Sequence, residues 1–201
     1  SWAETAQLGE FTFHRSSKFR SNHESFTRGN NLFFEGLGYK PDQFVGKTVV
    51  DLGAGSKLRA KFFEGAHVVA VEPLANKFVA EIEWCDLKDA EELYSEPAEK
   101  LIAGLVGRVD FLFSINVLDH CFDFQSCIQN IREYLRPGGT CFLAFDCHSK
   151  TDDLHPIIVN ERAATDIIFD AGFQIDKFHR MPSFHRGIAT YAVGFYATRP
   201  E

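Results

Sequence analysis

Four short apolar runs follow one another along the chain after residue 46, and segments of helical periodicity separate them. The runs are rich in β-branched or aromatic residues, and the first of them is closed by glycines, which is typical of buried strands. Strands that alternate with helices predict a parallel sheet with helices on both faces. We therefore expect an α/β fold with a doubly wound, mostly parallel sheet. The four runs are Lys47–Leu52, His67–Val71, Val109–Ile115 and Thr140–Phe145.

Weaker signals complete the predicted sheet, which would have seven strands. A strand is expected near Leu93–Ser95. The final runs, Phe173–Phe178 and Thr190–Ala197, have no helix between them, which indicates an antiparallel hairpin at the C-terminal edge of the sheet. A turn is expected at Pro137-Gly138-Gly139. The expected helical segments are 57–64, 74–90, 100–106 (a single turn), 124–135 and 161–171.

Residues 1–45 precede this alternation and are predicted to form an N-terminal helical lid, followed by a ligand-binding domain of residues 46–201. Apolar positions before Gly38 predict one helix that ends there. The segment also carries basic residues, which either grip an anionic group or form solvated surface. These are His14, Arg15, Arg20 and Arg28.

Composition narrows the possible functions. The 201 residues carry a net charge of −7, which disfavours a polyanion such as nucleic acid as the main partner. No apolar stretch approaches the roughly 20 residues of a membrane span. The five cysteines form no C-x-x-C pair, so we expect reduced thiols. The sequence therefore predicts a cytoplasmic protein with neither a membrane nor a nucleic-acid partner.

The strongest functional signal is the turn after the first strand, Asp51-Leu52-Gly53-Ala54-Gly55. Glycine permits a tight turn and close approach of a ligand to the backbone. The second strand ends in Glu72, 19 residues after Gly53, where a carboxylate can accept hydrogen bonds from both ribose hydroxyls of a nucleoside. A dinucleotide site would need a third glycine at position 58, which is Leu58, and the sequence has no Tyr-x-x-x-Lys pair of the reductase kind. A nicotinamide cofactor is therefore disfavoured.

Two further segments extend this pattern. Asn116-Val117-Leu118-Asp119-His120 closes the fourth strand, and Leu135-Arg136-Pro137-Gly138-Gly139 precedes the fifth. Together with the glycine turn and Glu72, they resemble the class I S-adenosylmethionine-dependent methyltransferases, in the branch with a Leu-Asp/Glu-His motif after the fourth strand. The resemblance covers about residues 45–197 and implies a Rossmann-like fold with S-adenosyl-L-methionine as cofactor.

The resemblance also implies which residues bind the cofactor. They are, for its amino acid part, Asp51, Gly53, Ala54 and Gly55; for the ribose, Glu72; for the adenine, Pro73, Leu74, Ala98 and Glu99; and for the methionine end, Asn116, Val117 and Leu118. An alternative adenine contact is Asp86, although the 14 residues after Glu72 leave little room for the intervening helix. Lys57 departs from the family pattern, which often has a glycine or a small residue near this position.

His120 and Asp119 are the candidate catalytic residues. A neutral imidazole where the sheet opens could accept a proton from a substrate hydroxyl or amine, or could simply be hydrogen-bonded within its loop. Asp119 could instead cap the helix that follows. Asp146, His148 and His155 follow the fifth strand, at the rim where substrates bind in this architecture, and are candidate substrate contacts. No metal is expected, because no carboxylate cluster follows the fourth strand.

These features predict a methyltransferase that acts on an oxygen or nitrogen nucleophile of a small molecule, such as a sugar or another metabolite. The absence of an Asn/Asp-Pro-Pro-Tyr run after the fourth strand disfavours amino methylation of DNA or protein. Two alternatives stay open. One is a cofactor-binding protein without transferase activity. The other is a protein or RNA methyltransferase that acts with a partner, which would show a basic or apolar patch around residues 14–34.

Overall fold

The computed structural model describes residues 2–152, 154–184 and 191–201. Its strands form a seven-stranded sheet in the order β3-β2-β1-β4-β5-β7-β6. The pairs β1–β2, β2–β3 and β4–β5 are parallel, and β7 pairs antiparallel with both β5 and β6. The predicted mostly parallel sheet is therefore confirmed. The strands are β1 Thr48–Leu52, β2 His67–Val71, β3 Glu92–Tyr94, β4 Val109–Ile115, β5 Leu135–Cys147, β6 Gln174–Met181 and β7 Tyr191–Thr198.

Two compact units make up the chain, Ser1–Pro97 and Ala98–Glu201. The first unit holds β1 to β3 together with helices α1 (Trp2–Ser16), α2 (Lys18–Ser21), α3 (His23–Gly36) and α4 (Ala75–Glu81). The second holds the other four strands with α5 (Phe124–Tyr134) and α6 (Glu161–Asp170). The division into a lid of residues 1–45 and a domain of residues 46–201 stays a prediction.

In the first unit, β1 and β2 are buried apolar strands, as the sequence predicts. They pair in parallel from Thr48 opposite His67 to Leu52 opposite Val71. Apart from their first residues, both strands are almost completely buried, which explains their near-continuous apolar sequence. Asp51 is the exception, a buried carboxyl group within β1. Its position marks the edge of the sheet where the functional residues begin.

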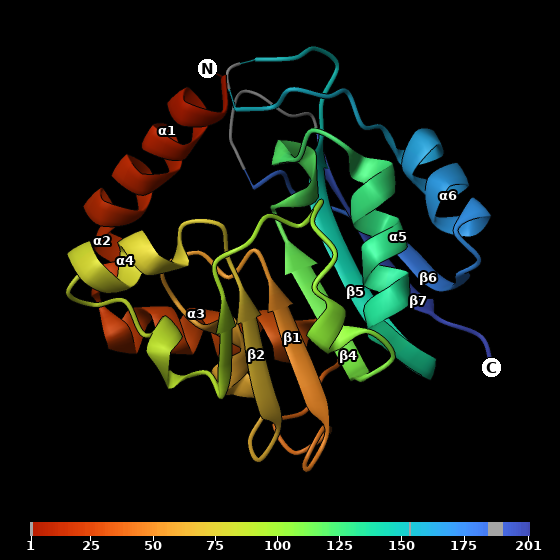
Figure 1. Ribbon diagram of the computed structural model, residues 1–201, viewed down its shortest axis with the longest axis horizontal. Helices are drawn as coiled ribbons and strands as arrows, with labels where there is room; N and C mark the ends of the chain where they lie inside the picture. Colours follow the sequence, from red (N-terminus) through yellow and green to blue (C-terminus); the bar gives the residue numbers. More distant parts are fainter. Residues whose placement is uncertain (1, 153, 185–190) are drawn as a thin grey trace. The chain divides into compact units, whose positions relative to one another are not determined.

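Helix α3 confirms the helix expected before Gly38. The Asn22 side chain caps its N-terminus by accepting a hydrogen bond from the Ser25 backbone N–H. Gly38 follows the helix with a positive φ of 91°. Phe34 anchors the helix through ring contacts with Phe62 and Phe63. The sequence placed only one helix within the expected helical segment 1–45, so α1 and α2 are additional. Helix α1 lies beside α4 (Figure 1). The rings of Phe11 in α1 and Phe78 in α4 stack on each other.

Two expected helices of this unit are much shorter than predicted. The segment 57–64 contains only a 3-10 turn, Arg59–Phe62, which ends at Phe63 in an extended conformation with its side chain buried. The segment 74–90 contains α4 and a second 3-10 turn, Leu87–Asp89. Ile82 ends α4 in an extended conformation with its side chain buried. Burial of Ile82 therefore overrides the helical periodicity of the sequence.

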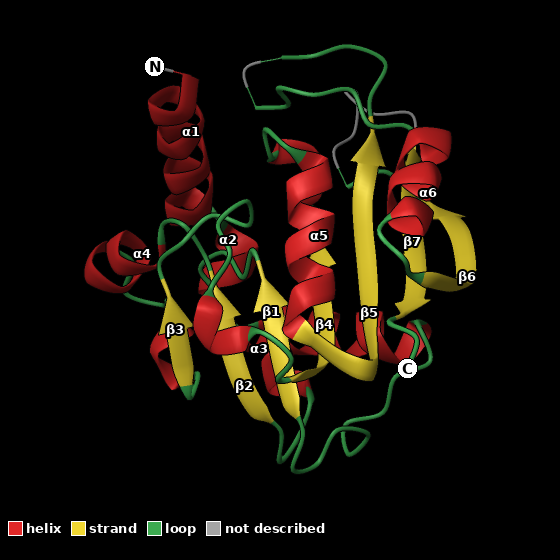
Figure 2. Cartoon of the chain, turned by 45° about the vertical axis from the view of Figure 1, so that its right-hand side comes forward, coloured by secondary structure: helices red, strands yellow, loops and turns green. Residues whose placement is uncertain are grey.

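The second unit confirms the predicted C-terminal antiparallel strands. Strand β7 pairs antiparallel with both β5 and β6. Helices α5 and α6 lie side by side against the sheet (Figure 2). The core beneath them is aromatic: Phe145 and Phe195 are fully buried and stack on each other, and Phe124 of α5 packs against Phe145. Of the expected last strand, position 190 lies outside the described residues.

The Pro-Gly-Gly turn lies inside strand β5 instead of ahead of it. The β4–β5 pairing jumps from Val109 opposite Leu135 to Phe111 opposite Thr140, so the residues between Leu135 and Thr140 bulge from the ladder. Gly138 has a positive φ of 75°, which the bulge requires. Beyond the bulge, β5 runs without a break to Cys147, and it places His148 at the end of a long paired strand.

No helix in the described part of the chain is long and apolar enough to cross a membrane.

Candidate functional site

The glycine loop follows β1 and has two residues in the left-handed region, Gly53 with φ 77° and Gly55 with φ 64°. The Gly53 backbone N–H donates to the Val71 carbonyl at 2.7 Å, which ties the loop to the end of β2. A Cβ atom at position 55 would collide with the imidazole of His14. Glycine is therefore required at position 55 for two separate reasons, the backbone conformation and the close approach of His14.

Glu72 lies at the end of β2 and braces this loop. Its Oε2 accepts the Gly55 N–H at 2.9 Å, and its Oε1 accepts the Leu74 N–H at 2.9 Å. Burial raises the pKa of Glu72 to about 7, and the two backbone donors oppose that rise. Each carboxylate oxygen has a second lone pair, so the expected ribose contact is compatible with this geometry. Pro73 and Leu74 continue from Glu72 into α4.

Asp51 is a second buried carboxyl group beside the glycine loop. Its Oδ2 accepts the Ala60 N–H at 3.3 Å. Burial raises the pKa of Asp51 to about 7, while the positive charge of Arg59 lowers it. Both acids that the family resemblance assigns to the cofactor thus change charge near neutral pH, which is typical of functional groups.

His14 reaches the glycine loop from α1, a contact that the sequence did not predict. Its Nδ1 accepts the Ser56 backbone N–H at 3.1 Å and lies 2.8 Å from the Ser56 hydroxyl. Burial lowers the pKa of His14 to about 3, so the ring is neutral. Of the basic residues expected to form a lid or solvated surface, His14 is buried, while Arg15 and Arg28 are exposed.

Lys57 and Asp86 form an ion pair next to the glycine loop. The Lys57 Nζ lies 3.0 Å from Asp86 Oδ2, and Asp86 Oδ1 accepts the Leu58 N–H at 2.7 Å. The family pattern often has a small residue near this position, whereas Lys57 here makes an ion pair with Asp86. The spacing argument against Asp86 as adenine contact was wrong, because α4 is short enough to fit before it. Its hydrogen bonds nevertheless commit the Asp86 carboxylate to the loop.

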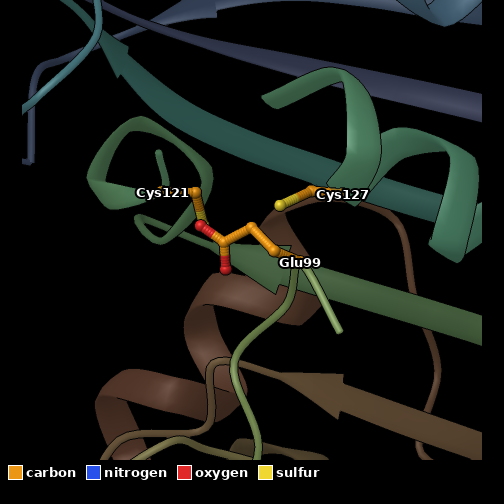
Figure 3. Close-up of side chains that lie close together, drawn as sticks. All are labelled: Glu99, Cys121 and Cys127. Atoms are coloured by element: carbon orange, nitrogen blue, oxygen red, sulfur yellow. The ribbon is translucent and has the colours of Figure 1, made fainter. Parts of the chain in front are cut away.

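In the second unit, Glu99 points toward Cys121 and Cys127 (Figure 3). Its Oε1 accepts the Phe122 N–H at 2.8 Å, and the carbonyl of Ala98 accepts from the Asn130 side chain at 2.9 Å. Ala98 and Glu99, in the loop after β3, are therefore each fixed by a hydrogen bond within this unit. Their role toward adenine stays a prediction.

Asn116 follows β4 with a positive φ of 57°, the one described non-glycine residue in the left-handed region. Asn tolerates this conformation better than most residues, and such local strain is often found at functional sites. Its backbone N–H donates to the Ala144 carbonyl at 2.7 Å. The chain then passes through Val117 and the buried Leu118. The expected role of these three residues in lining the cofactor stays a prediction.

Asp119 is fully buried and does not cap the next helix. Asp123 caps α5 instead, accepting the Ser126 N–H, so the capping alternative for Asp119 is wrong. The Asp119 Oδ2 lies 2.9 Å from His148 Nε2, 3.7 Å from His155 Nε2 and 3.9 Å from His120 Nε2. Three histidines from three segments therefore surround one carboxylate. We refer to these four residues as the histidine cluster.

The histidine cluster is tightly packed. Ring centroids are 4.0 Å apart for His148 and His155, and 4.4 Å apart for His120 and His155. The Nδ1 of His155 lies 2.8 Å from Asp152 Oδ1. Burial lowers the pKa of His155, with a smaller contribution from the neighbouring His120. Since Asp119, His148 and His155 present ligand atoms within 4.8 Å of one another, the ground for expecting no metal site is removed.

Asp146 was expected to contact substrate, but its carboxylate holds a neighbouring segment of the chain. Oδ1 accepts the Phe184 N–H at 2.9 Å, and Oδ2 accepts the Ser183 hydroxyl at 3.2 Å. The adjacent Cys147 is a buried thiol whose pKa burial raises to about 11. All five cysteines are free, as predicted.

Comparison with known proteins supports the same class. Residues 50–143 match the model of a family described as a methyltransferase domain. The ubiquinone biosynthesis O-methyltransferase of Pseudomonas paraeruginosa is 27% identical over 136 residues, which are 65% of this chain and 55% of that protein. The chain thus spans just over half the length of this curated relative.

Solved structures share the fold. The 1,6-didemethyltoxoflavin-N1-methyltransferase of Burkholderia thailandensis, with S-adenosylhomocysteine bound, has a TM-score of 0.60 at 17% identity, covering 100% of this chain and 91% of its own. A cyclase has a TM-score of 0.67 at 14% identity, covering 88% of this chain and 82% of its own. The family match covers the segment from β1 into β5, and the solved structures share the fold of the whole sheet.

Proposed function

We propose that this protein transfers a methyl group from S-adenosylmethionine to an oxygen or nitrogen nucleophile of a small molecule. The observation that carries the proposal is the glycine loop with the buried Glu72 carboxylate fixed against it by the Gly55 N–H. This is the arrangement expected for a nucleoside whose ribose hydroxyls donate to Glu72. One structural neighbour has S-adenosylhomocysteine bound. This compound is the product that remains after such a transfer.

The proposed chemistry is an in-line displacement. The nucleophile forms a bond to the methyl carbon while the carbon–sulfur bond breaks, and its electron pair stays on sulfur as a neutral thioether. Alignment of the nucleophile, methyl carbon and sulfur supplies most of the rate enhancement. An oxygen nucleophile also has to lose a proton, and we assign its acceptance to His120, which lies within the histidine cluster.

A small-molecule substrate is favoured by charge and by the relatives. The net charge of −7 disfavours nucleic acid. The curated relative is named as an O-methyltransferase and the structural neighbour as an N-methyltransferase, so both kinds of nucleophile stay within the proposal.

Calorimetric titration of S-adenosylmethionine tests the cofactor part of the proposal. We expect wild-type protein to bind with micromolar affinity and Glu72→Ala to bind at least tenfold more weakly, about 1.4 kcal/mol. The matched control is Glu81→Ala, which removes an exposed carboxylate at the end of α4 and should leave affinity unchanged. Absence of binding to the wild type, or equal loss in both variants, would contradict the proposal.

Transfer itself is tested by following S-adenosylhomocysteine formation against a panel of hydroxyl and amine metabolites, with wild type and His120→Ala. Turnover that falls in His120→Ala for hydroxyl substrates supports the assigned base. The cyclase neighbour shows that this fold also serves other reactions. Cofactor binding without product across the panel would therefore favour the alternative, a cofactor-binding protein without transferase activity.

A further inference from the structure

The histidine cluster gathers nitrogen and oxygen ligand atoms around one buried carboxylate. The Asp152 carboxylate can only accept, so Nδ1 of His155 carries a proton and donates to Asp152 at 2.8 Å. The other nitrogen of His155, Nε2, lies 3.7 Å from Asp119 Oδ2, and His148 Nε2 lies 2.9 Å from the same oxygen.

Burial makes an acceptor without a partner costly in this cluster. The side chains of Asp119, His148 and His155 are at most 1% exposed. Among the described residues, Asp119 Oδ1 has no hydrogen-bond partner. A buried carboxylate in this position is stabilised by a cation beside it.

We propose that Asp119, His148 and His155 bind one divalent transition-metal ion, and that Zn²⁺ is the cation this ligand set fits best. Two histidines and one carboxylate, with a fourth position left open, form a typical catalytic zinc site. Ligand atoms about 2.0–2.1 Å from a tetrahedral ion lie roughly 3.3 Å apart. The observed separations of 2.9 Å and 3.7 Å from Asp119 Oδ2 lie on either side of that value.

The surroundings of His155 resemble the outer shell of a metal site. Metal-bound histidine usually donates its second ring N–H to a carboxylate, which fixes the ring orientation. Asp152 provides this contact, and it is fixed in turn by the backbone N–H groups of Leu154 and His155 at 2.8 and 2.9 Å. His155 is thus already oriented by Asp152, as a metal-binding histidine usually is by its outer-shell carboxylate.

A second group, Glu99 with Cys121 and Cys127, could also hold a metal ion (Figure 3). Its polar atoms are already occupied, however. Glu99 accepts the Phe122 N–H, and the thiol of Cys121 donates to the Val117 carbonyl at 3.5 Å. Glu99 is also only partly buried, whereas Asp119 is fully buried, so the observations favour the histidine cluster.

Zinc titration of chelator-treated full-length protein, by calorimetry without S-adenosylmethionine, tests the proposal. We expect one ion per chain and a rise in melting temperature on zinc addition. His148→Gln and His155→Gln should each weaken binding at least tenfold. Asp152→Asn should weaken it roughly 10–100-fold through the outer shell. Co²⁺ bound in place of Zn²⁺ should show visible absorption that the two histidine variants lose.

The matched control is His67→Gln. It removes another histidine–carboxylate contact, His67 Nε2 with Glu92 Oε1 at 2.7 Å, on an exposed surface of the first unit. Unchanged zinc affinity in this control supports a specific site. The proposal is overturned if the wild type binds no zinc, if His148→Gln binds like the wild type, or if only Cys127→Ser abolishes binding.

The titration stands apart from the test of the proposed function. Zinc binding is measured without S-adenosylmethionine, and the cofactor titration uses metal-free protein. Zinc binding without cofactor binding would leave the metal site intact and contradict the proposed function. The reverse result would contradict only the metal site.

Discussion

The glycine loop and the histidine cluster are both buried polar regions, and they differ in how their polar groups are satisfied. At the glycine loop, each carboxylate meets a donor: Glu72 accepts from Gly55 and Leu74, and Asp86 accepts from Leu58. In the histidine cluster, the buried Oδ1 of Asp119 has no hydrogen-bond partner among the described residues. The carboxylates of the first region are satisfied without a ligand, whereas Asp119 in the second would be stabilised by a cation.

This difference indicates how each region would respond to a ligand. A satisfied loop is rigid before binding, so its ligand adds hydrogen bonds to an existing frame. A buried carboxylate oxygen without a partner destabilises the fold until a cation binds beside it, so binding there should also raise the stability of the fold. Four predictions test the contrast.

The largest expected effect comes from Gly55→Ala. The added Cβ would occupy a left-handed conformation and collide with His14. We expect the free energy of unfolding to fall by roughly 2–5 kcal/mol, measured by urea denaturation. Gly107→Ala is the matched control, because Gly107 has a φ of 68° but open space around its Cβ position. It should lose only roughly 1–2 kcal/mol. Equal losses of unfolding free energy in the two variants would mean that the His14 side chain moves aside at no cost in free energy.

The pH dependence of stability tests the buried acid of the loop. Burial raises the pKa of Glu72 from 4.5 to about 7, so between these values the native state holds a proton that the unfolded state has released. Stability from this group is therefore present below pH 4.5 and is lost as pH rises to about 7. Relative to wild type, Glu72→Gln should gain on the order of 3 kcal/mol between pH 4.5 and 8.

The comparison with Glu72→Gln is needed because His14 titrates in the opposite sense. Burial lowers its pKa to about 3, so its contribution to stability falls as pH drops below 6.5. The difference between wild type and variant cancels this term. A difference that does not change with pH would show that Glu72 is ionised throughout.

Asp119→Asn should have a smaller effect on metal-free protein. Replacing the carboxylate by an amide removes the buried negative charge and the acceptor without a partner, while the Asn oxygen can still accept from His148. We expect a change in unfolding free energy within about 1 kcal/mol, together with loss of zinc binding. A loss above roughly 3 kcal/mol would instead indicate that Asp119 forms a structural ion pair with a charged histidine.

The smallest effect is expected for His67→Gln, which sets a baseline for both regions. The ring and its partner Glu92 are partly exposed. Exposed pairs contribute roughly 0–1 kcal/mol, so the melting temperature should hardly move. A change as large as that of Gly55→Ala would remove the contrast between buried and exposed contacts.

The sequence predicts the first region well because its signals are local. The glycines, the strand-ending Glu72 and the buried strands all lie within a short segment, where spacing alone indicates their arrangement. The histidine cluster draws residues 119, 148 and 155 from a 3-10 turn, the end of β5 and a loop. Its residues could be singled out one by one, but their convergence depends on packing that no local pattern encodes.

The same reasoning explains the unexpected N-terminal helix. The apolar positions of α1 are few, and its buried His14 is a polar residue that gains its place only against the glycine loop. Likewise, α4 is shorter than its periodicity suggests because Ile82 is buried in an extended conformation. Tertiary contacts override local propensity at both places.

The hydrogen bond between Asp86 and the glycine loop has a consequence for the order of folding events. The glycine loop has no α-helix after it to hold its shape, and its Leu58 N–H is bound by a carboxylate 28 positions further along the chain. Contacts between distant positions form slowly, because a long loop has to close first. The most recognisable segment of this sequence should thus acquire its final shape late, after β2 and α4 have formed.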